Sequence, residues 1–418
     1  MIKRTLFDQI KKHLISKEIT LIVGPRQAGK TTLMELLEEN LKKQGKKTVF
    51  LRLDLDRDRP FFASQERLLQ RITLEVGGNK GYVFIDEVQR KENAGLFLKG
   101  LYDMKLPYKF IVSGSGSIEL KEKIHESLPG RKRLFELSTL SFEEFVHFKT
   151  DYKYALSLSK SFEVYREKIL EYLEEYLNFG GYPRVVLGKT IEEKRAVIDD
   201  IYQSFLEKDI SILLNVQKTE SLTNLVRALA SQIGNLVNVA ELSNTLGLSV
   251  QTVKQYLWYL EKTYIIKKVT PYFKNVRKEI TKAPTYYFID LGLRNYAVNQ
   301  FGRAVISPDG FLFENFVYNS LKAHLKLTST TIHFWRTQDK AEVDFVLDST
   351  LKATPIEVKY THLKSPEISR SFRSFLTKYR PDKAYIVHLG SNFEADIEGT
   401  KVYFIPYAEI DFIPAVLV

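Results

Sequence analysis

The feature that most constrains the fold is a short glycine-containing loop between an apolar run and an amphipathic segment. The apolar run covers residues 19–23 and is typical of a buried strand, whereas residues 32–37, which begin with Thr32, have the pattern of a helix. The loop between them matches G-x-x-x-x-G-K-[ST] through Gly24, Pro25, Arg26, Gln27, Ala28, Gly29, Lys30 and Thr31. A strand, such a loop and a helix in succession form a phosphate cradle, because backbone N–H groups at the helix start point toward the anion. The sequence therefore predicts an α/β domain that binds phosphate groups through residues 24–32.

The side chains of this region suit a nucleoside triphosphate bound together with Mg²⁺. We expect Lys30 to reach the β- and γ-phosphates and the hydroxyl of Thr31 to bind the cation. A second apolar run, residues 81–85, ends in Asp86 and Glu87. Asp86 is expected to hold Mg²⁺ directly or through water, and Glu87 to polarise the water that attacks the γ-phosphate. ATP and Mg²⁺ are therefore the expected cofactors.

A third apolar run, residues 109–112, ends in a turn rich in serine and glycine. A small polar residue at this point could contact the γ-phosphate or the attacking water. Ser113 and Ser115 are both candidates for this role, and an ordinary Gly/Ser turn would explain the same residues.

These motifs resemble those of the AAA-type ATPases, with GPRQAGKT as Walker A, VFIDE as Walker B and residues 113–117 as sensor 1. The stretches LPGR and LSTLSFEEF within residues 128–145, and FGGYP at residues 179–183, resemble an archaeal and bacterial group of such ATPases. Members of that group carry a C-terminal domain without an assigned function, and the resemblance covers essentially the whole chain. The resemblance implies a homo-oligomer, a ring or a dimer, in which an arginine acts on a neighbour's nucleotide. Arg131 is the first candidate and Arg133 the alternative, although either could simply solvate a turn.

The composition of the 418 residues limits the class of protein. No run of 18 apolar residues, no apolar segment of a signal peptide and no cysteine occurs, and the histidines lack metal-ligand spacing. We therefore expect a cytoplasmic protein of two to four domains without membrane contact. The net charge of +11 favours a polyanionic partner, DNA more than RNA, but could also serve solubility alone.

The middle of the chain is predicted to be helical. Residues 152–214 have helical periodicity with a break at the FGGYP motif, and the resemblance implies a lid beside the nucleotide. A helix is then expected to end at Gly247, and Ser249 can cap a second helix that ends at Lys262. With an expected strand at residues 264–269, this order predicts a winged helix-turn-helix. Its basic and aromatic residues could contact a nucleic-acid backbone or serve only in packing.

The C-terminal part contains a second group of chemically suited residues, expected on one helix and two strands: Glu314, Asp344, Glu357 and Lys359. Three carboxylates and a lysine suit Mg²⁺-dependent phosphodiester cleavage, because the acids bind metal and the lysine orients the nucleophile. We expect Asp344 and Glu357 to be the metal ligands. The order helix-Glu, strand-Asp, strand-Glu-x-Lys resembles the PD-(D/E)XK nuclease superfamily, which implies a restriction-endonuclease-like fold. The motif is loose, so the domain could retain the fold without the activity.

Taken together, these patterns predict an α/β protein in four parts. Residues 1–150 form a P-loop AAA-type core, residues 151–218 a helical lid, residues 219–282 a winged helix-turn-helix and residues 283–418 a nuclease-like domain. The expected function is Mg²⁺-dependent ATP hydrolysis that acts on nucleic acid, with metal-dependent DNA cleavage as a further activity. The alternative is a nucleotide-dependent switch or scaffold that binds a protein and has an inactive nuclease-like domain.

Overall fold

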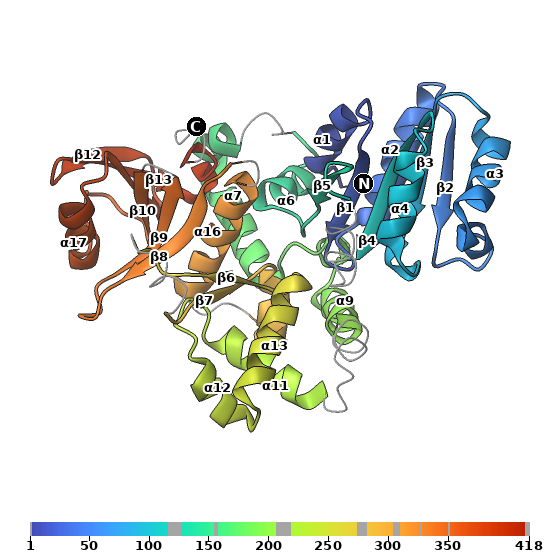
Figure 1. Ribbon diagram of the computed structural model, residues 1–418. Coiled ribbons are helices and arrows are strands. Elements are labelled where there is room, and N and C mark those ends of the chain that lie inside the picture. Colours follow the sequence, from blue (N-terminus) through green and yellow to red (C-terminus); the bar gives the residue numbers. More distant parts are fainter. Residues whose placement is uncertain are drawn as a thin grey trace.

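The N-terminal part of the protein is a parallel sheet between two layers of helices (Figure 1). The computed structural model describes residues 2–115, 128–153, 158–205, 219–273, 282–303, 310–325, 328–349 and 352–413. The sheet has the order β2-β3-β4-β1-β5, and every pairing in it is parallel. Its strands are β1 (Ile19–Gly24), β2 (Thr48–Arg52), β3 (Gly81–Asp86), β4 (Tyr108–Ser115) and β5 (Lys132–Glu136). Its helices are α1 (Leu6–His13), α2 (Lys30–Lys43), α3 (Gln65–Val76) and α4 (Ala94–Asp103).

Burial on both faces explains why the strands of this sheet read as continuous apolar runs. All six residues of β1 and all six of β3 are buried. Side chains of α1 and α2 form one hydrophobic cluster with the sheet, and side chains of α3 and α4 form another. The three strands expected at residues 19–23, 81–85 and 109–112 are thus confirmed, and their carboxyl ends meet at one edge of the sheet.

A group of helices follows, and its arrangement depends on the buried carboxylate of Asp290. The helices are α6 (Phe142–Lys149), α7 (Leu158–Phe179), α8 (Pro183–Leu187), α9 (Ile191–Ser204) and α15 (Leu291–Ala297). Asp290 caps α15 by accepting a hydrogen bond from Leu293 N (3.0 Å), and its second oxygen accepts one from Gly181 N (2.8 Å). Gly180 has a φ of 72°, and a Cβ there would lie 2.3 Å from Asp290 Oδ1. The glycine pair of FGGYP therefore allows the chain to pass close to this carboxylate.

Three helices and a two-stranded antiparallel sheet come next. They are α11 (Thr219–Ser231), α12 (Val239–Leu246), α13 (Val250–Lys262), β6 (Ile266–Val269) and β7 (Thr285–Phe288). The two helices expected here are present. Gly247 ends α12 with a φ of 63°, and Ser249 Oγ caps α13 by accepting a hydrogen bond from Thr252 N (3.0 Å). The boundary expected between residues 282 and 283 falls between the two paired strands β6 and β7.

The C-terminal part is a six-stranded mixed sheet between two helices. Its order is β12-β13-β11-β10-β9-β8, with parallel pairing among β10, β11 and β13. The strands are β8 (Thr331–Arg336), β9 (Glu342–Ser349), β10 (Lys352–Val358), β11 (Lys383–His388), β12 (Phe393–Ile397) and β13 (Thr400–Pro406). The helices are α16 (Gly310–His324) and α17 (Arg370–Tyr379). Alternation along β9 sends Phe345 to the cluster with α16 and Val346 to the cluster with α17, so the helices cover opposite faces.

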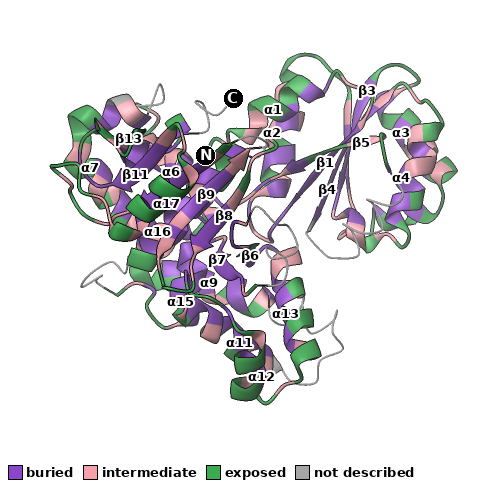
Figure 2. Ribbon diagram, turned by 60° about the vertical axis from the view of Figure 1, so that its left-hand side comes forward, coloured by how far each residue is buried: buried purple, intermediate pink, exposed green. Residues whose placement is uncertain are grey.

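One hydrophobic cluster extends from Leu140 to Ile413 and includes side chains of α6, α7, α13, α16 and the C-terminal sheet. Figure 2 shows the strands of both large sheets as mostly buried. The chain after β6 continues along the C-terminal sheet, where Tyr272 N donates to Phe334 O (2.6 Å). The helical, two-stranded and C-terminal parts therefore share one core, whereas the N-terminal sheet packs into two other clusters, one of which also includes Tyr264. In the described part of the chain, no helix is long and apolar enough to cross a lipid bilayer.

Candidate functional site

The phosphate loop joins the carboxyl end of β1 to the start of α2. Gly29 immediately precedes α2 with a φ of 94° and a ψ of 26°, a left-handed conformation that favours glycine. The loop borders a cavity of about 570 Å³, which residues 26–32 line together with Glu87. The N-terminal end of α2 therefore lies at a loop that borders a cavity.

The ammonium group of Lys30 is held by the loop itself. Only 6% of this residue is exposed, and Nζ donates to Gly24 O (3.1 Å) and Pro25 O (2.7 Å). Backbone carbonyl groups are weaker partners for an ammonium group than phosphate oxygens are. Lys30 is therefore placed in the loop where it can exchange these carbonyls for an anionic ligand.

The carboxylate of Asp86 joins the two nucleotide motifs. Thr31 Oγ1 donates to Asp86 Oδ2 (2.7 Å), Ser113 Oγ donates to Asp86 Oδ1, and Glu87 N also donates to Oδ1 (3.1 Å). Asp86 is fully buried. Of the two serine candidates, Ser113 thus reaches the site, whereas the side chain of Ser115 lies outside the described residues. Hydroxyl and carboxylate oxygens of this kind fit a Mg²⁺ ion.

Glu87 lines the same cavity in an unusual backbone conformation. Its φ is 58° and its ψ is 42°, which is a left-handed conformation rare for a residue other than glycine. The side chain amide of Gln89 donates to Glu87 Oε2. Such a backbone conformation persists only where the surrounding structure holds it in place, and it is common at functional sites. Gln89 was not singled out by the sequence motifs, although it lies two residues after the Asp-Glu pair.

Residues far from the phosphate loop in the sequence also line the cavity. The sequence motifs do not mark them as site residues. They are Ile2, Arg4, Pro183, Arg184, Leu187 and Ser204. Arg184 Nη1 donates to Gln27 Oε1 in the phosphate loop (2.8 Å) and to Asp200 Oδ2 (3.0 Å). One sequence signal points to Arg184. It directly follows the FGGYP motif, which lies in the segment that the resemblance places beside the nucleotide.

Arg131 lies at the opposite end of β1 from the phosphate loop. Its carbonyl oxygen accepts from Ile19 N (2.9 Å), so about 16 Å of strand separates it from Gly24. The guanidinium pairs with Asp103, with 2.8 Å between Nε and Oδ1. The guanidinium of Arg133, the alternative, lies over the ring of Phe135. Neither arginine is among the residues that line the cavity around the loop.

Two of the four C-terminal residues form a close pair of acids. The register places Ile356 opposite Phe345, so the next pair along the strands is Glu357 with Asp344. Asp344 Oδ2 accepts from Val358 N (2.7 Å), and burial, with Glu357 adding in the same direction, raises the pKa of Asp344 to about 7.

Glu357 is also buried, with 5% of the residue exposed. Its Oε1 pairs with Lys359 Nζ (2.7 Å), whereas its Oε2 is buried without a hydrogen-bond partner. Asp344, Glu357 and Lys359 thus lie near one another, and their role in metal binding and cleavage stays a prediction.

Glu314 does not complete this group. Its Oε1 accepts a hydrogen bond from the hydroxyl of Tyr287 in β7, and a Cβ at Gly234 would lie 3.2 Å from the same oxygen. Within the described ranges, no three His, Cys, Asp or Glu side chains are arranged to hold a metal ion. The expected three-carboxylate site is therefore not present there. The helix position of Glu314 was correct, but the sequence motif does not show which neighbouring element its side chain contacts.

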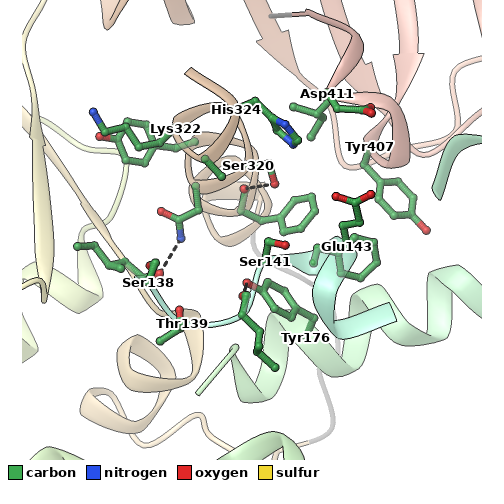
Figure 3. A pocket seen from close by; sticks show the side chains of 18 of the residues that line it. Ser138, Thr139, Ser141, Glu143, Tyr176, Ser320, Lys322, His324, Tyr407 and Asp411 are labelled. Atoms are coloured by element: carbon green, nitrogen blue, oxygen red, sulfur yellow. Dashed lines mark hydrogen bonds between the residues drawn. The ribbon is translucent and has the colours of Figure 1, made fainter. Parts of the chain in front are cut away.

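A separate cavity of about 110 Å³ lies between the segment that precedes α6 and helix α16 (Figure 3). Ser138, Glu143, His324 and Asp411 are among its lining residues. Burial raises the pKa of Glu143, with Asp411 adding to this effect and His324 opposing it. No sequence motif marks a site here.

Comparisons with known proteins divide the chain into three matched regions. Residues 16–146 match the family described as AAA domain. Residues 170–304 match a domain of unknown function, DUF8612, and residues 309–410 match another, DUF4143. The phosphate loop and the match over residues 16–146 support an AAA-type P-loop domain in this part of the chain, a class of nucleotide-binding ATPases.

Similar proteins occur in bacteria and archaea. A protein of Mycobacterium tuberculosis is 28% identical over 394 residues, which cover 93% of this chain and 80% of that protein. A protein of Methanocaldococcus jannaschii is 25% identical over 350 residues, covering 81% and 74%. Both are described as uncharacterised. Among solved structures, AMPPCP-bound DnaA from Aquifex aeolicus is 15% identical, covers 62% of this chain and 86% of its own, and has a TM-score of 0.28.

Proposed function

We propose that the protein binds ATP with Mg²⁺ in the cavity beside residues 24–31 and hydrolyses it. One observation carries this proposal: side chains suited to phosphate binding, Mg²⁺ coordination and water activation converge at one site. Thr31 and Asp86, whose side chains form a direct hydrogen bond, are 55 residues apart in the sequence. Lys30 and Glu87 line the same cavity.

We assign each of these side chains one role in the proposed reaction. Lys30 exchanges its contacts with Gly24 and Pro25 for the β- and γ-phosphates. Thr31 and Asp86 would hold Mg²⁺, which would neutralise phosphate charge. Glu87 orients the attacking water and accepts its proton, while Gln89 restrains the carboxylate.

Binding of a non-hydrolysable ATP analogue to Lys30→Ala and to the wild type tests the site. Lys30→Ala should lose binding by a factor of about 100 or more, because a charged donor to the phosphates is removed. Lys43→Ala is a matched control, since Lys43 lies in the same helix and is 71% exposed in an ion pair with Glu39. Equal affinity of Lys30→Ala and wild type would contradict the proposal.

We further propose that the ATPase acts on nucleic acid, with DNA preferred to RNA. The net charge of +11 supports an anionic partner, and α13 offers a contact face. On this helix Val253 and Leu257 are buried, whereas Lys254 and Trp258 are exposed and Lys262 Nζ lies 5.4 Å from the centroid of Trp258. A winged helix-turn-helix built from α11–α13, β6 and β7 would use this face against a phosphate backbone.

We also propose that the C-terminal domain cleaves DNA. The pair Asp344 and Glu357 supports it, because a bound cation would satisfy the buried Glu357 Oε2 that has no hydrogen-bond partner. Lys359, which pairs with Glu357, would orient the attacking water. A PD-(D/E)XK-like domain is thus proposed with two acidic ligands, and Glu314 is not among them.

Nicking of plasmid and branched DNA, measured with Mg²⁺ or Mn²⁺, tests this activity. Asp344→Ala should abolish nicking and leave ATP hydrolysis unchanged, whereas Asp348→Ala on the same strand should nick like the wild type. If the wild type neither cleaves DNA nor hydrolyses ATP faster with DNA present, the alternative is favoured. That alternative is a nucleotide-dependent scaffold that binds a protein.

A further inference from the structure

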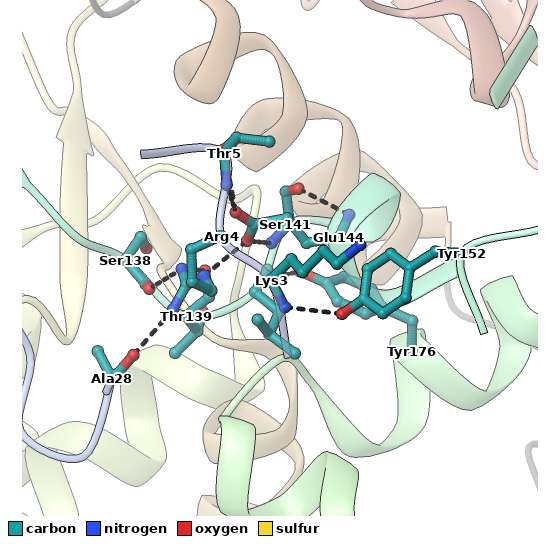
Figure 4. A network of polar contacts seen from close by, with 11 residues as sticks. Lys3, Arg4, Thr5, Ala28, Ser138, Thr139, Ser141, Glu144, Tyr152 and Tyr176 are labelled. Carbon is teal, nitrogen blue, oxygen red and sulfur yellow. Dashed lines mark hydrogen bonds and ion pairs between the residues drawn. The ribbon is translucent and has the colours of Figure 1, made fainter. Parts of the chain in front are cut away.

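The N-terminal segment that precedes α1 contacts the phosphate loop through Arg4 (Figure 4). Arg4 Nη1 donates to Ala28 O (2.9 Å), and Nη2 donates to Ser138 O (2.7 Å) and Thr139 O (3.3 Å). Nε donates to Glu144 Oε2 (3.0 Å). The side chain is 8% exposed. Arg4 thus links the phosphate loop to the segment that leads into α6, and it lies outside the region that matches the AAA family.

Glu144 holds the guanidinium of Arg4 in one orientation. Its Oε1 accepts from Thr5 N (2.8 Å) and Thr5 Oγ1 (3.0 Å), and its Oε2 also accepts from Ser141 N (3.1 Å). Ser141 Oγ in turn accepts from Glu144 N (3.2 Å), which completes a capping box. Because the carboxylate is only 6% exposed and fully bonded, the ion pair is geometrically fixed.

The contact with Ala28 O affects the phosphate loop through the peptide bond between Ala28 and Gly29. In a trans peptide the C=O of one residue and the N–H of the next point in opposite directions. An arginine that holds the carbonyl of Ala28 on one side therefore directs the N–H of Gly29 to the other side. Glycine offers little resistance to rotation of this peptide, so an external restraint matters here.

We propose that Arg4 is a positioning residue for the phosphates of the bound nucleotide. By holding Ala28 O, it orients the N–H of Gly29 for phosphate groups that enter the cavity, which Gly29 lines. Glu144 supports this role by fixing Arg4. The inference rests on the proposed ATP binding and adds a residue to it that neither the loop motif nor the AAA family match includes.

The test separates positioning from folding through steady-state ATP hydrolysis. A backbone donor that binds phosphate equally in the ground and transition states affects KM and not kcat. Arg4→Met should therefore raise KM about tenfold, with kcat within about twofold of wild type. The inhibition constant of inorganic pyrophosphate, measured as a competitive inhibitor, should rise by a similar factor. A purely structural role would instead lower kcat through loss of folded protein and leave KM unchanged.

Lys3→Met is the matched control, because Lys3 is exposed and its ammonium lies over the ring of Tyr152 away from the loop. This variant should have the wild-type KM. If Arg4→Met does not fold, Arg4→Lys replaces it; its single ammonium cannot reproduce the planar set of four contacts, so KM should still rise. A wild-type KM in Arg4→Met or Arg4→Lys overturns the inference and leaves the proposed function standing. Absence of ATP binding in the wild type would instead refute the proposed function.

Discussion

At the scale of residues, the proposed nucleotide site contains hydroxyl groups that donate hydrogen bonds to one buried carboxylate. Asp86 receives hydrogen bonds from Thr31 and Ser113, which lie on α2 and β4. A buried carboxylate needs such donors, because an unpaired one would be costly. The same donors fix the direction of the carboxylate toward the phosphate loop. Ser113 is therefore expected to act on the reaction through Asp86.

Ser113→Ala tests this arrangement. The variant removes a donor from Asp86 Oδ1 and leaves the bond from Glu87 N. The Mg²⁺ concentration that gives half-maximal ATP hydrolysis should rise about tenfold, because a hydrogen bond to a charged group is lost. The measurement is a Mg²⁺ titration of the hydrolysis rate at saturating ATP. An unchanged Mg²⁺ dependence would show that Ser113 does not orient Asp86.

The buried carboxylate of Asp290 gives a prediction about pH. Burial raises its pKa from 3.8 to about 6, although the N–H groups of Gly181 and Leu293 oppose the shift. The folded protein thus binds the proton more tightly than the unfolded chain. This contribution to the free energy of unfolding is complete below pH 3.8 and is lost as pH rises through about 6. From pH 4 to 7, the wild type should lose about 2 kcal/mol relative to Asp290→Asn in urea unfolding. Parallel pH profiles of the two proteins would be inconsistent with this titration.

At the scale of elements, β7 connects the two-stranded sheet to α16 through Tyr287 and Glu314. Tyr287 is buried, and burial together with Glu314 raises the pKa of its hydroxyl well above the usual value. The hydroxyl is thus protonated and donates to Glu314. Phe288 N also donates to Asn315 Oδ1 (2.8 Å) in the same helix. These bonds indicate that the start of α16 serves as a docking point for β7.

Tyr287→Phe should destabilise the protein by about 1–3 kcal/mol, because Glu314 loses a buried donor. Tyr385→Phe is a suitable control, since the hydroxyl of Tyr385 is buried without a hydrogen-bond partner and its removal should be neutral or stabilising. Denaturant unfolding of both variants measures the difference. Equal stabilities would contradict the docking role of the Tyr287–Glu314 bond.

Particular residues show how much of this structure the sequence could predict. Periodicity and end signals located β1, β3 and the phosphate loop, and they gave the bounds of α13, because these patterns are local in the chain. They also placed Asp344 and Glu357 on two successive strands of the chain, although not the pairing of these strands. They could not show that Arg4 contacts Glu144, 140 residues away, or that Glu314 contacts Tyr287. Such contacts depend on how the elements pack together, which periodicity does not specify.

At the scale of the whole molecule, the N-terminal sheet packs into two hydrophobic clusters, and the remaining parts share another. The nucleotide cavity lies where the N-terminal part and these remaining parts meet, since Pro183 and Arg184 line it together with the phosphate loop. A nucleotide bound in this cavity would therefore contact both parts of the molecule. We propose that hydrolysis changes their relative position, and that a second subunit contributes an arginine.

Mixing of variants tests the proposed contribution from a second subunit. Arg131 pairs with Asp103 at the end of β1 far from its own loop, so any role at a nucleotide lies in a neighbour. Arg131→Ala and Lys30→Ala should each be inactive, whereas a mixture should recover part of the ATPase activity through hybrid interfaces. Normal ATP hydrolysis by a monomeric Arg131→Ala protein would contradict a role for Arg131 at a neighbour's nucleotide.

ATP hydrolysis by Glu87→Gln tests the central claim most directly. The substitution keeps the size of the side chain and removes the charge that activates water, so ATP should bind within about threefold of wild type while kcat falls about 100-fold or more. Glu92→Gln, an exposed acid five residues further along, should behave like the wild type. A Glu87→Gln protein that hydrolyses ATP at the wild-type rate would contradict the assignment of this cavity as the site of hydrolysis.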